Sequence, residues 1–396
     1  MADTKRALPI LFVIMFLVMI GFGIIIPVLP FYAKDLGASP TELGFLMAIY
    51  SITQLIFAPM WGKISDRIGR KPVILIGILG LSLSFFWMGF ATSLWMLFAA
   101  RFFGGLLSAA NMQTVMAYAA DITSSEDRGK GMGVVGAATG LGFVFGPAVG
   151  GIFSKISLSM PFLVAGVSSF ITFFLAWIFL KESLSKEQRA RTQMERFFKK
   201  EAVAGPHFIL LLLQLFVSIS MAGLEATFAY FGAEKAGLDT VDLGYVFMIM
   251  GLASAMVQGG LIGKLTKRFG EGCVIQAGAV ISAIGFALIL FIDSFITAAI
   301  FLTIFSIGNG VIRPSLSALL TKTSGAKYGS ISGLISSFDS LGRIAGPPLG
   351  GWLFTKSINL PFLSGIVLSV IALFLYYVYA VQTKKKISSP ANDQLR

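Results

Sequence analysis

Long apolar runs that are nearly free of charge dominate this sequence of 396 residues. Runs of about 18 or more apolar residues are long enough to cross the hydrocarbon core of a bilayer as a helix. We find twelve of them, at 8–31, 43–62, 73–91, 95–119, 131–153, 160–180, 207–231, 243–262, 273–292, 296–320, 329–353 and 361–381. Only 13% of the residues are charged, against about a quarter in an average soluble domain. The sequence therefore predicts an all-α polytopic membrane protein.

Lysine and arginine are distributed unevenly over the connections between these runs. If both termini and the even-numbered connections share one side, the other side holds only four lysines: Lys34, Lys155, Lys235 and Lys356. Because positively charged connections stay in the cytoplasm, we expect a multi-pass protein of the cell membrane with both termini cytoplasmic. This bias beside anionic lipid also explains the net charge of +12, so no nucleic-acid partner is expected.

The sequence contains an internal repeat. GLGFVFGPAVGG at 140–151 and SLGRIAGPPLGG at 340–351 carry glycine and proline at the same places. Further segments match in the same order at an offset of 200 or 201 residues, which indicates duplication of a six-helix unit. Two such halves run through the membrane in the same direction, an arrangement in which transporters place a site between the halves. We expect an N-terminal six-helix bundle at 1–185, a cytoplasmic central linker at 186–205 and a C-terminal six-helix bundle at 206–396.

Two motifs stand out from the apolar background. The connection GKISDRIGRK carries glycines, an acid and a basic cluster: Gly62, Asp66, Arg67, Gly69 and Arg70. We expect its two glycines to permit a tight reversal between the second and third helices. The first copy of the repeated stretch carries Gly142, Gly146, Pro147, Gly150 and Gly151. Glycines four residues apart line one helix face and allow a neighbouring backbone to approach closely, while the proline kinks the helix.

Together these motifs resemble the major facilitator superfamily over essentially the whole chain. The glycine motif resembles the signature of the drug:proton antiporters within that superfamily. The segment AGLEATFAYF around Glu225, with Gln54, Arg101 and Arg313 in their own segments, is similar to Gram-positive multidrug exporters of the Bmr/NorA type. The resemblance implies twelve transmembrane helices arranged as two pseudo-symmetric six-helix halves.

The resemblance also implies a role for the GKISDRIGRK connection as a latch of the outward-facing state. Asp66 would meet the N-terminal end of the eleventh helix, where the helix dipole favours an anion. Arg70 would pair with Asp121 at the end of the fourth helix. The second copy of the connection has Lys267 in place of the acid, so we expect only the first copy to act as a latch.

Charged residues inside membrane helices are costly and usually mark function. The candidates are Arg101, Glu225, Arg313, Asp339 and Arg343. By resemblance, we expect proton coupling to involve Glu225, Asp339, Arg313 and Arg101. Substrate contacts are expected from Gln54, Glu225, Asn309 and Arg101.

One position departs from the pattern of these exporters. Where they usually have an aspartate, this chain has Asn309, which cannot ionise. Asp339 and Arg343 lie four residues apart and therefore share one helix face. Asp339 either replaces the missing acid as a titrating group or forms a closed structural ion pair with Arg343.

The function that this reasoning favours is proton-coupled efflux of amphipathic, often cationic, small molecules by alternating access. The alternative is a narrower transporter of a sugar, an amino acid or another metabolite. We expect a monomer in the lipid bilayer that takes small molecules and protons as its substrates. The sequence has no nucleotide-binding motif and no nucleophile or metal constellation, so we expect neither an enzyme nor a cofactor or bound metal. The single cysteine, Cys273, excludes an intramolecular disulfide.

Overall fold

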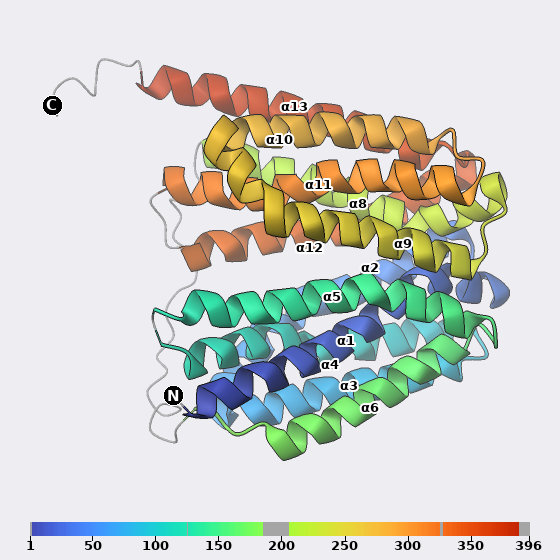
Figure 1. Ribbon diagram of the computed structural model, residues 1–396. Coiled ribbons are helices and arrows are strands. Elements are labelled where there is room, and N and C mark those ends of the chain that lie inside the picture. Colours follow the sequence, from blue (N-terminus) through green and yellow to red (C-terminus); the bar gives the residue numbers. More distant parts are fainter. Residues whose placement is uncertain (1, 125, 185–205, 325–327, 388–396) are drawn as a thin grey trace, which may run out of the picture.

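The computed structural model describes residues 2–124, 126–184, 206–324 and 328–387 of the chain. These residues form helices joined by short turns (Figure 1). The helices of the first half are α1 (Ala2–Asp35), α2 (Pro40–Ile68), α3 (Arg70–Gly89), α4 (Leu94–Ile122), α5 (Arg128–Ser154) and α6 (Met160–Phe179). Those of the second half are α8 (Pro206–Ala236), α9 (Thr240–Met256), a π-helical turn (Val257–Leu261), α10 (Ile262–Ile289), α11 (Phe295–Ser324), α12 (Tyr328–Lys356) and α13 (Leu360–Ile387). The expected linker at 186–205 lies outside the described residues.

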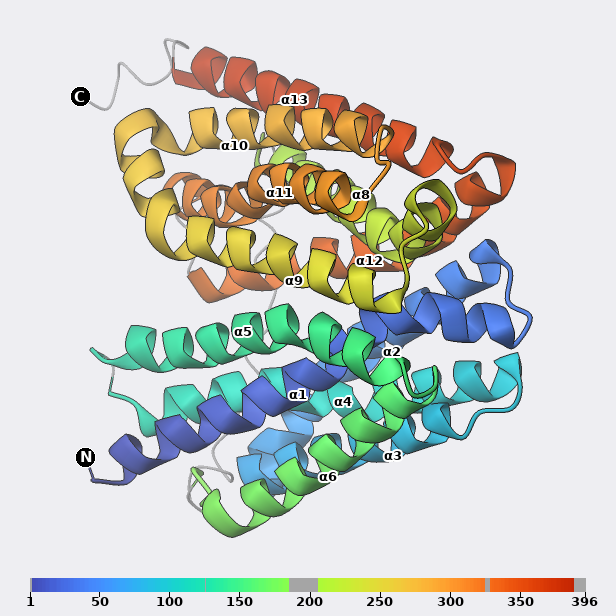
Figure 2. The same cartoon turned by 45° about the vertical axis from the view of Figure 1, so that its right-hand side comes forward.

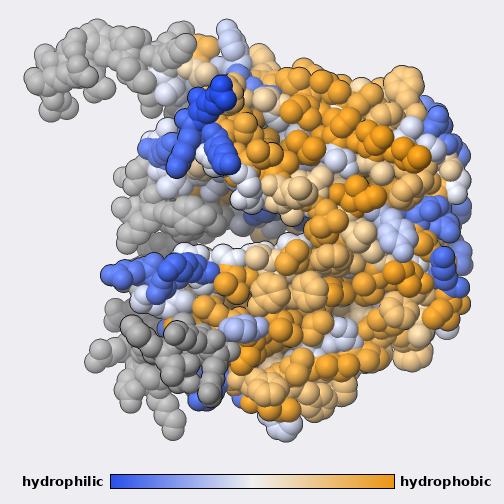
Figure 3. Space-filling view, viewed as in Figure 1, coloured by the Kyte–Doolittle hydropathy of each residue, from blue (hydrophilic) through white to orange (hydrophobic). Residues whose placement is uncertain are grey.

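The helices are suited to a membrane. Within the described residues, ten helical segments are long and apolar enough to cross one, and one of these, Thr240–Ile289, joins α9 to α10. The segment α12, which carries Asp339 and Arg343, is not among the ten. On the face seen in Figure 3, apolar residues cover the middle of the surface and polar residues gather toward its two ends. The chain is therefore a multi-pass membrane protein.

The helices gather into two groups. In both ribbon views α1–α6 lie together, and α8–α13 lie together above them (Figures 1 and 2). We call these groups the N-terminal half and the C-terminal half. The start of α1 and the end of α13 lie at the same end of the bundle, which we call the terminal end, and the opposite end is the distal end (Figure 1).

Within each half, the repeated glycines pack one helix against the first helix of that half. A Cβ atom added to Gly146 of α5 would lie 2.6 Å from the Cα of Gly23 in α1. A Cβ atom added to Gly346 of α12 would lie 2.6 Å from the carbonyl oxygen of Ile219 in α8. Helix backbones therefore touch at both places, and only glycine leaves room for this approach.

The last glycine of each copy makes a different contact, because it faces the other half. A Cβ atom added to Gly151 of α5 would lie 2.7 Å from the carbonyl oxygen of Thr240 in α9. A Cβ atom added to Gly351 of α12 would lie 3.0 Å from the Cα of Thr41 in α2. The two cross-half contacts are thus symmetric, and both lie toward the distal end of the bundle.

Hydrogen bonds join the halves at the same end. The Ser154 and Thr240 hydroxyl groups bond to each other, and the Tyr230 hydroxyl donates to the Pro30 carbonyl at 2.7 Å. At the terminal end, in contrast, the surface is hollowed between the halves (Figure 3). The described residues therefore meet across the halves at the distal end and leave a hollow between the halves toward the terminal end.

The reversal between α2 and α3 occurs at one glycine and not at two. Gly69 has a φ of 110°, a region that favours glycine, and Gly270 takes the equivalent place in the second half with a φ of 80°. The prediction that Gly62 also forms the reversal is wrong, because α2 continues through it to Ile68. The end of an apolar run marks the edge of the membrane, and a helix can continue beyond it with polar residues. The Ser65 hydroxyl stabilises the C-terminal part of α2 by donating to the Gly62 carbonyl at 2.8 Å.

Replacement of Gly146 by alanine should destabilise the protein, while the same change at Gly136 in the same helix should not. No atom lies within 4 Å of a Cβ added to Gly136, so the gain in helix propensity is about 1 kcal/mol there. At Gly146 the backbone of α1 must move away, at a cost of about 1–3 kcal/mol. Melting temperatures in detergent measure both effects, and equal shifts would contradict the close packing of α1 and α5.

Candidate functional site

Four charged side chains meet between α8, α11 and α12. Arg343 of α12 lies between two acids, with Nη1 3.5 Å from Glu225 Oε2 and Nε 3.9 Å from Asp339 Oδ2. Arg313 of α11 approaches the second acid, with Nη1 3.4 Å from Asp339 Oδ2. We call these four residues the charge cluster. When all four are ionised, the cluster is neutral.

Two polar residues of α8 complete the surroundings of Asp339. The Ser218 hydroxyl donates to Asp339 Oδ1 at 2.5 Å, and the Gln214 amide donates to the same oxygen at 3.4 Å. Gln214 and Ser218 lie four residues apart, and Glu225 lies seven residues further, so all three share one face of α8. Sequence reasoning missed Gln214 and Ser218, although polar residues at this spacing in an apolar helix are a usable signal.

The cluster borders a cavity of about 230 Å³ in the C-terminal half. Its polar lining comes from α8, α9, the π-helical turn, α11 and α12, and consists of Gln214, Ser218, Ser254, Gln258, Ser306, Asn309, Arg313, Asp339 and Arg343. The side chains of Arg313 and Arg343 are 52% and 46% exposed, whereas Glu225 is 7% exposed. The guanidinium groups therefore face the cavity, and Glu225 lies behind Arg343. Within the described residues, no group of His, Cys, Asp and Glu could hold a metal ion.

Arg101 and Gln54, both expected to contact the substrate, lie in the N-terminal half and do not line this cavity. The Arg101 guanidinium carbon lies 4.4 Å from the centre of the Tyr50 ring, a cation–π contact. The Gln54 amide donates to the Tyr50 hydroxyl at 2.9 Å, and that hydroxyl also bonds to Ser108. Tyr50, which sequence reasoning missed, thus connects the two predicted residues.

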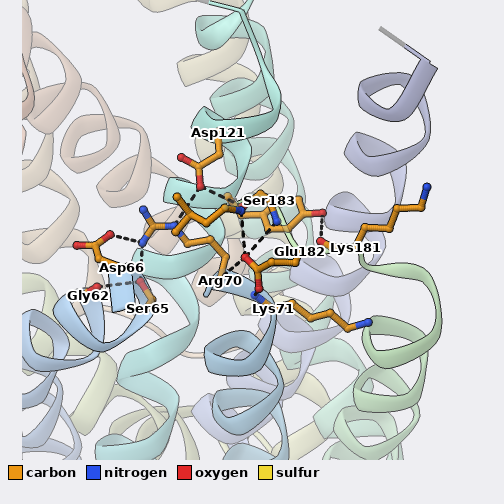
Figure 4. Close-up of polar contacts among 11 residues, drawn as sticks. Gly62, Ser65, Asp66, Arg70, Lys71, Asp121, Lys181, Glu182 and Ser183 are labelled. Atoms are coloured by element: carbon orange, nitrogen blue, oxygen red, sulfur yellow. Dashed lines mark hydrogen bonds and ion pairs between the residues drawn. The ribbon is translucent and has the colours of Figure 1, made fainter. Parts of the chain in front are cut away.

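At the terminal end, Arg70 joins α2, α3 and α4 (Figure 4). Its Nη1 lies 2.6 Å from Asp66 Oδ1, and its Nε lies 3.1 Å from Asp121 Oδ2. The expected contact between Arg70 and Asp121 is therefore present. Arg67 is exposed. The expected contact between Asp66 and the start of α12, at Tyr328, stays a prediction.

The second copy of this connection carries an ion pair of opposite polarity. Glu271 follows Gly270 as Arg70 follows Gly69, and it pairs with Lys322 near the end of α11. At an offset of 201 residues, Glu271 corresponds to Arg70 and Lys322 corresponds to Asp121. Sequence reasoning missed this pair because it compared Lys267 with the acid of the first copy and no other position. That only the first copy acts as a latch stays a prediction.

Comparison of the sequence with known proteins finds one protein family and relatives that are named as drug-resistance proteins. The family described as Major Facilitator Superfamily matches residues 11–343 and 259–395. Multidrug resistance protein 2 of Bacillus subtilis (strain 168) is 33% identical over 383 residues, which cover 95% of this chain and 96% of the relative. Quinolone resistance protein NorA of Staphylococcus aureus (strain MSSA476) is 28% identical over 365 residues, which cover 91% of this chain and 93% of the relative.

A solved structure shares the fold. It is that of a bacterial homolog of the human lysosomal transporter Spinster, in an inward-facing and occupied conformation. The two structures superpose with a TM-score of 0.78 over 98% of each chain, at 15% sequence identity. At this identity the likeness shows the fold alone.

Replacement of Arg343 by glutamine should cost more stability than replacement of Arg313. Without Arg343, the Glu225 carboxylate is buried and loses its partner, which costs about 3–5 kcal/mol. Without Arg313, Asp339 keeps Ser218, Gln214 and Arg343, so a smaller loss is expected. Melting temperatures of Arg343→Gln and Arg313→Gln in detergent test the order.

A double variant supplies the control for this comparison. Glu225→Gln combined with Arg343→Gln removes both partners, so it should recover part of the stability that Arg343→Gln loses. Additive losses in the double variant would show that the two residues do not depend on each other.

Proposed function

This chain belongs to the Major Facilitator Superfamily, and on that premise we propose that it exports amphipathic, often cationic, small molecules in exchange for protons. One observation carries the proposal: a buried acid, Glu225, is held by an arginine at the edge of a polar cavity. The named relatives, a multidrug resistance protein and a quinolone resistance protein, support drugs as the substrate class. The protein acts as a transporter and not as an enzyme, as a monomer in the cell membrane.

The direction of transport depends on which end of the bundle is cytoplasmic. The lysine and arginine bias of the sequence assigns the terminal end to the cytoplasm. The hollow between the halves then opens to the cytoplasm, and the structure is an inward-facing state (Figure 3). A drug that enters from this side reaches the charge cluster in the C-terminal half.

The chemistry of the cluster suits exchange of two cations. A cationic drug and a proton both neutralise a carboxylate, so each competes with Arg343 for Glu225. Glu225 takes a proton from the outside and releases its hold on the drug there. After the halves rock back, Glu225 loses the proton to the cytoplasm and binds the next drug molecule.

Helix α12 connects this chemistry to the movement of the halves. Asp339, Arg343, Pro347 and Gly351 follow one another at intervals of four residues, a row that winds slowly around α12. The first two contact α8 and α11, and Gly351 contacts α2 across the halves. A change in charge at the cluster therefore acts on the helix that closes the distal end.

The remaining predicted residues take supporting roles in this proposal. Gln54, Arg101 and Asn309 contact the substrate, and Arg101 also takes part in proton coupling together with Asp339 and Arg313. Asp66, Arg70 and Asp121 form a latch that favours the outward-facing state. Narrow transport of one metabolite is the alternative function, and the antiporter glycine motif and the buried acid of α8 favour drug efflux over it.

Glu225→Gln should abolish proton-driven efflux, because glutamine can neither take up a proton nor attract a cation by charge. The measurement is efflux of a fluorescent cationic dye from proteoliposomes against its gradient, with an imposed pH difference. Glu234→Gln in the exposed part of the same helix is the matched control and should transport normally. Undiminished uphill efflux by well-expressed Glu225→Gln protein would remove Glu225 from the mechanism. Efflux limited to one sugar or amino acid would favour the alternative function.

Asp339→Asn separates the two interpretations of this acid. In this variant Arg343 still contacts Glu225, and Arg313 is half exposed, so no buried charge is left without a partner. If Asp339 titrates during transport, the pH dependence of drug binding should change while the melting temperature stays similar. A lower melting temperature with an unchanged pH profile would indicate a structural ion pair.

A further inference from the structure

The chain that leaves α6 folds back onto the proposed latch (Figure 4). The Tyr118 hydroxyl of α4 donates to the Lys181 carbonyl at 2.6 Å. The Ser183 hydroxyl donates to Asp121 Oδ2 at 3.0 Å, the same oxygen that Arg70 contacts. The first residues after α6 are thus attached to the end of α4 and to the ion pair that Arg70 forms there.

Between these two attachments, Glu182 binds the start of α3. Its Oε1 accepts a hydrogen bond from the backbone N–H of Arg70 at 2.8 Å, and its Oε2 accepts one from the backbone N–H of Lys71 at 3.1 Å. The first N–H groups of a helix have no partner within the helix and carry the positive end of its dipole. Gly69 precedes them and has no side chain to serve as a cap. The carboxylate of Glu182 therefore supplies the missing cap.

In the C-terminal half, the negative charge at the equivalent helix start comes from the first residue of that helical segment. Glu271 is the first residue after the kink at Gly270 inside α10, the place equivalent to the start of α3, and its carboxylate pairs with Lys322. In the N-terminal half, the corresponding position holds Arg70, whose positive charge is unfavourable at a helix start. Glu182, which lies 112 residues away in the sequence, provides the negative charge there. Because Glu182 supplies the negative charge, position 70 can be an arginine that forms ion pairs with Asp66 and Asp121.

From these contacts we infer that Glu182 is a positioning residue of the latch. It holds the backbone of Arg70, and Arg70 in turn holds Asp66 and Asp121. The residues that begin the central linker thereby influence the balance between inward-facing and outward-facing states. The inference rests on the latch of the proposed function and adds to it a residue from another part of the chain.

The test uses cysteine labelling of the full-length protein in a Cys273→Ala background. Gln258→Cys reports on the cavity that is open in this structure, and Val241→Cys reports on the contact with Gly151 that is closed. Glu182→Gln should raise the labelling rate of the first reporter relative to the second by about fivefold, the loss expected for a charged helix cap. Glu126→Gln removes an exposed acid near the same end and should leave the ratio unchanged.

Two further variants decide the interpretation. Asp66→Asn should shift the ratio in the same direction, and the double variant should shift it no further than either single change, because both act on one unit. Glu182→Asp keeps the charge and should retain part of the wild-type labelling ratio. If Glu182→Gln does not fold, Glu182→Asp is used for the same measurement.

The outcomes separate this inference from the proposed function. A shift with Asp66→Asn but none with Glu182→Gln would overturn the inference and leave the latch intact. Additive shifts, or a shift with Glu182→Gln alone, would also overturn it, because Glu182 would then act outside the latch. No shift in either variant would remove the latch together with the role of Glu182, while the dye efflux of Glu225 variants tests the transport function separately.

Discussion

Arg343 contacts two carboxylates that come from different helices, Glu225 on α8 and Asp339 on α12. Inside a membrane each of these charges alone would be costly, so the arginine makes both acids tolerable. Its position also makes the arrangement adjustable. In the proposed cycle, a guanidinium shared between two acids can stay with one when a proton or a drug neutralises the other. The neutral cluster therefore tolerates a change of charge at either acid without leaving a buried ion alone.

The glycine contacts explain how such a local change reaches the other half. Where backbones touch, as at Gly346 and Gly351, no flexible side chain lies between the helices to absorb a displacement. In the proposed cycle, a shift of α12 at the cluster is therefore transmitted to α8 and, across the halves, to α2. In the N-terminal half, Gly146 packs α5 against α1 in the same way, and Gly151 contacts α9 across the halves. Close packing within each half is suited to a movement in which the halves rock as units.

The sequence was sufficient to predict an all-helical membrane protein of two halves, and the five charged residues that it singled out lie within helices. It did not predict which arginine meets which acid. That pairing depends on how α8 and α12 rotate when they pack, and spacing within one helix reveals only the pair of Asp339 and Arg343. The reversal at Gly62 was misplaced because polar residues continue a helix beyond the membrane edge. Glu182 was missed because its partners lie far away in the sequence, where no local pattern connects them.

The two halves stabilise their equivalent helix connections, at Gly69 and Gly270, with different residues. Both connections need a glycine of positive φ, a negative charge at the following helix start and an ion pair to the neighbouring helix. In the second half, Glu271 supplies the charge and one partner of the pair at once. In the first half these tasks are divided between Glu182 and Arg70, and the division leaves Arg70 with donors for a second acid, Asp66. Duplication followed by exchange of charge thus leaves one connection with a single ion pair and the other with an arginine that contacts two acids.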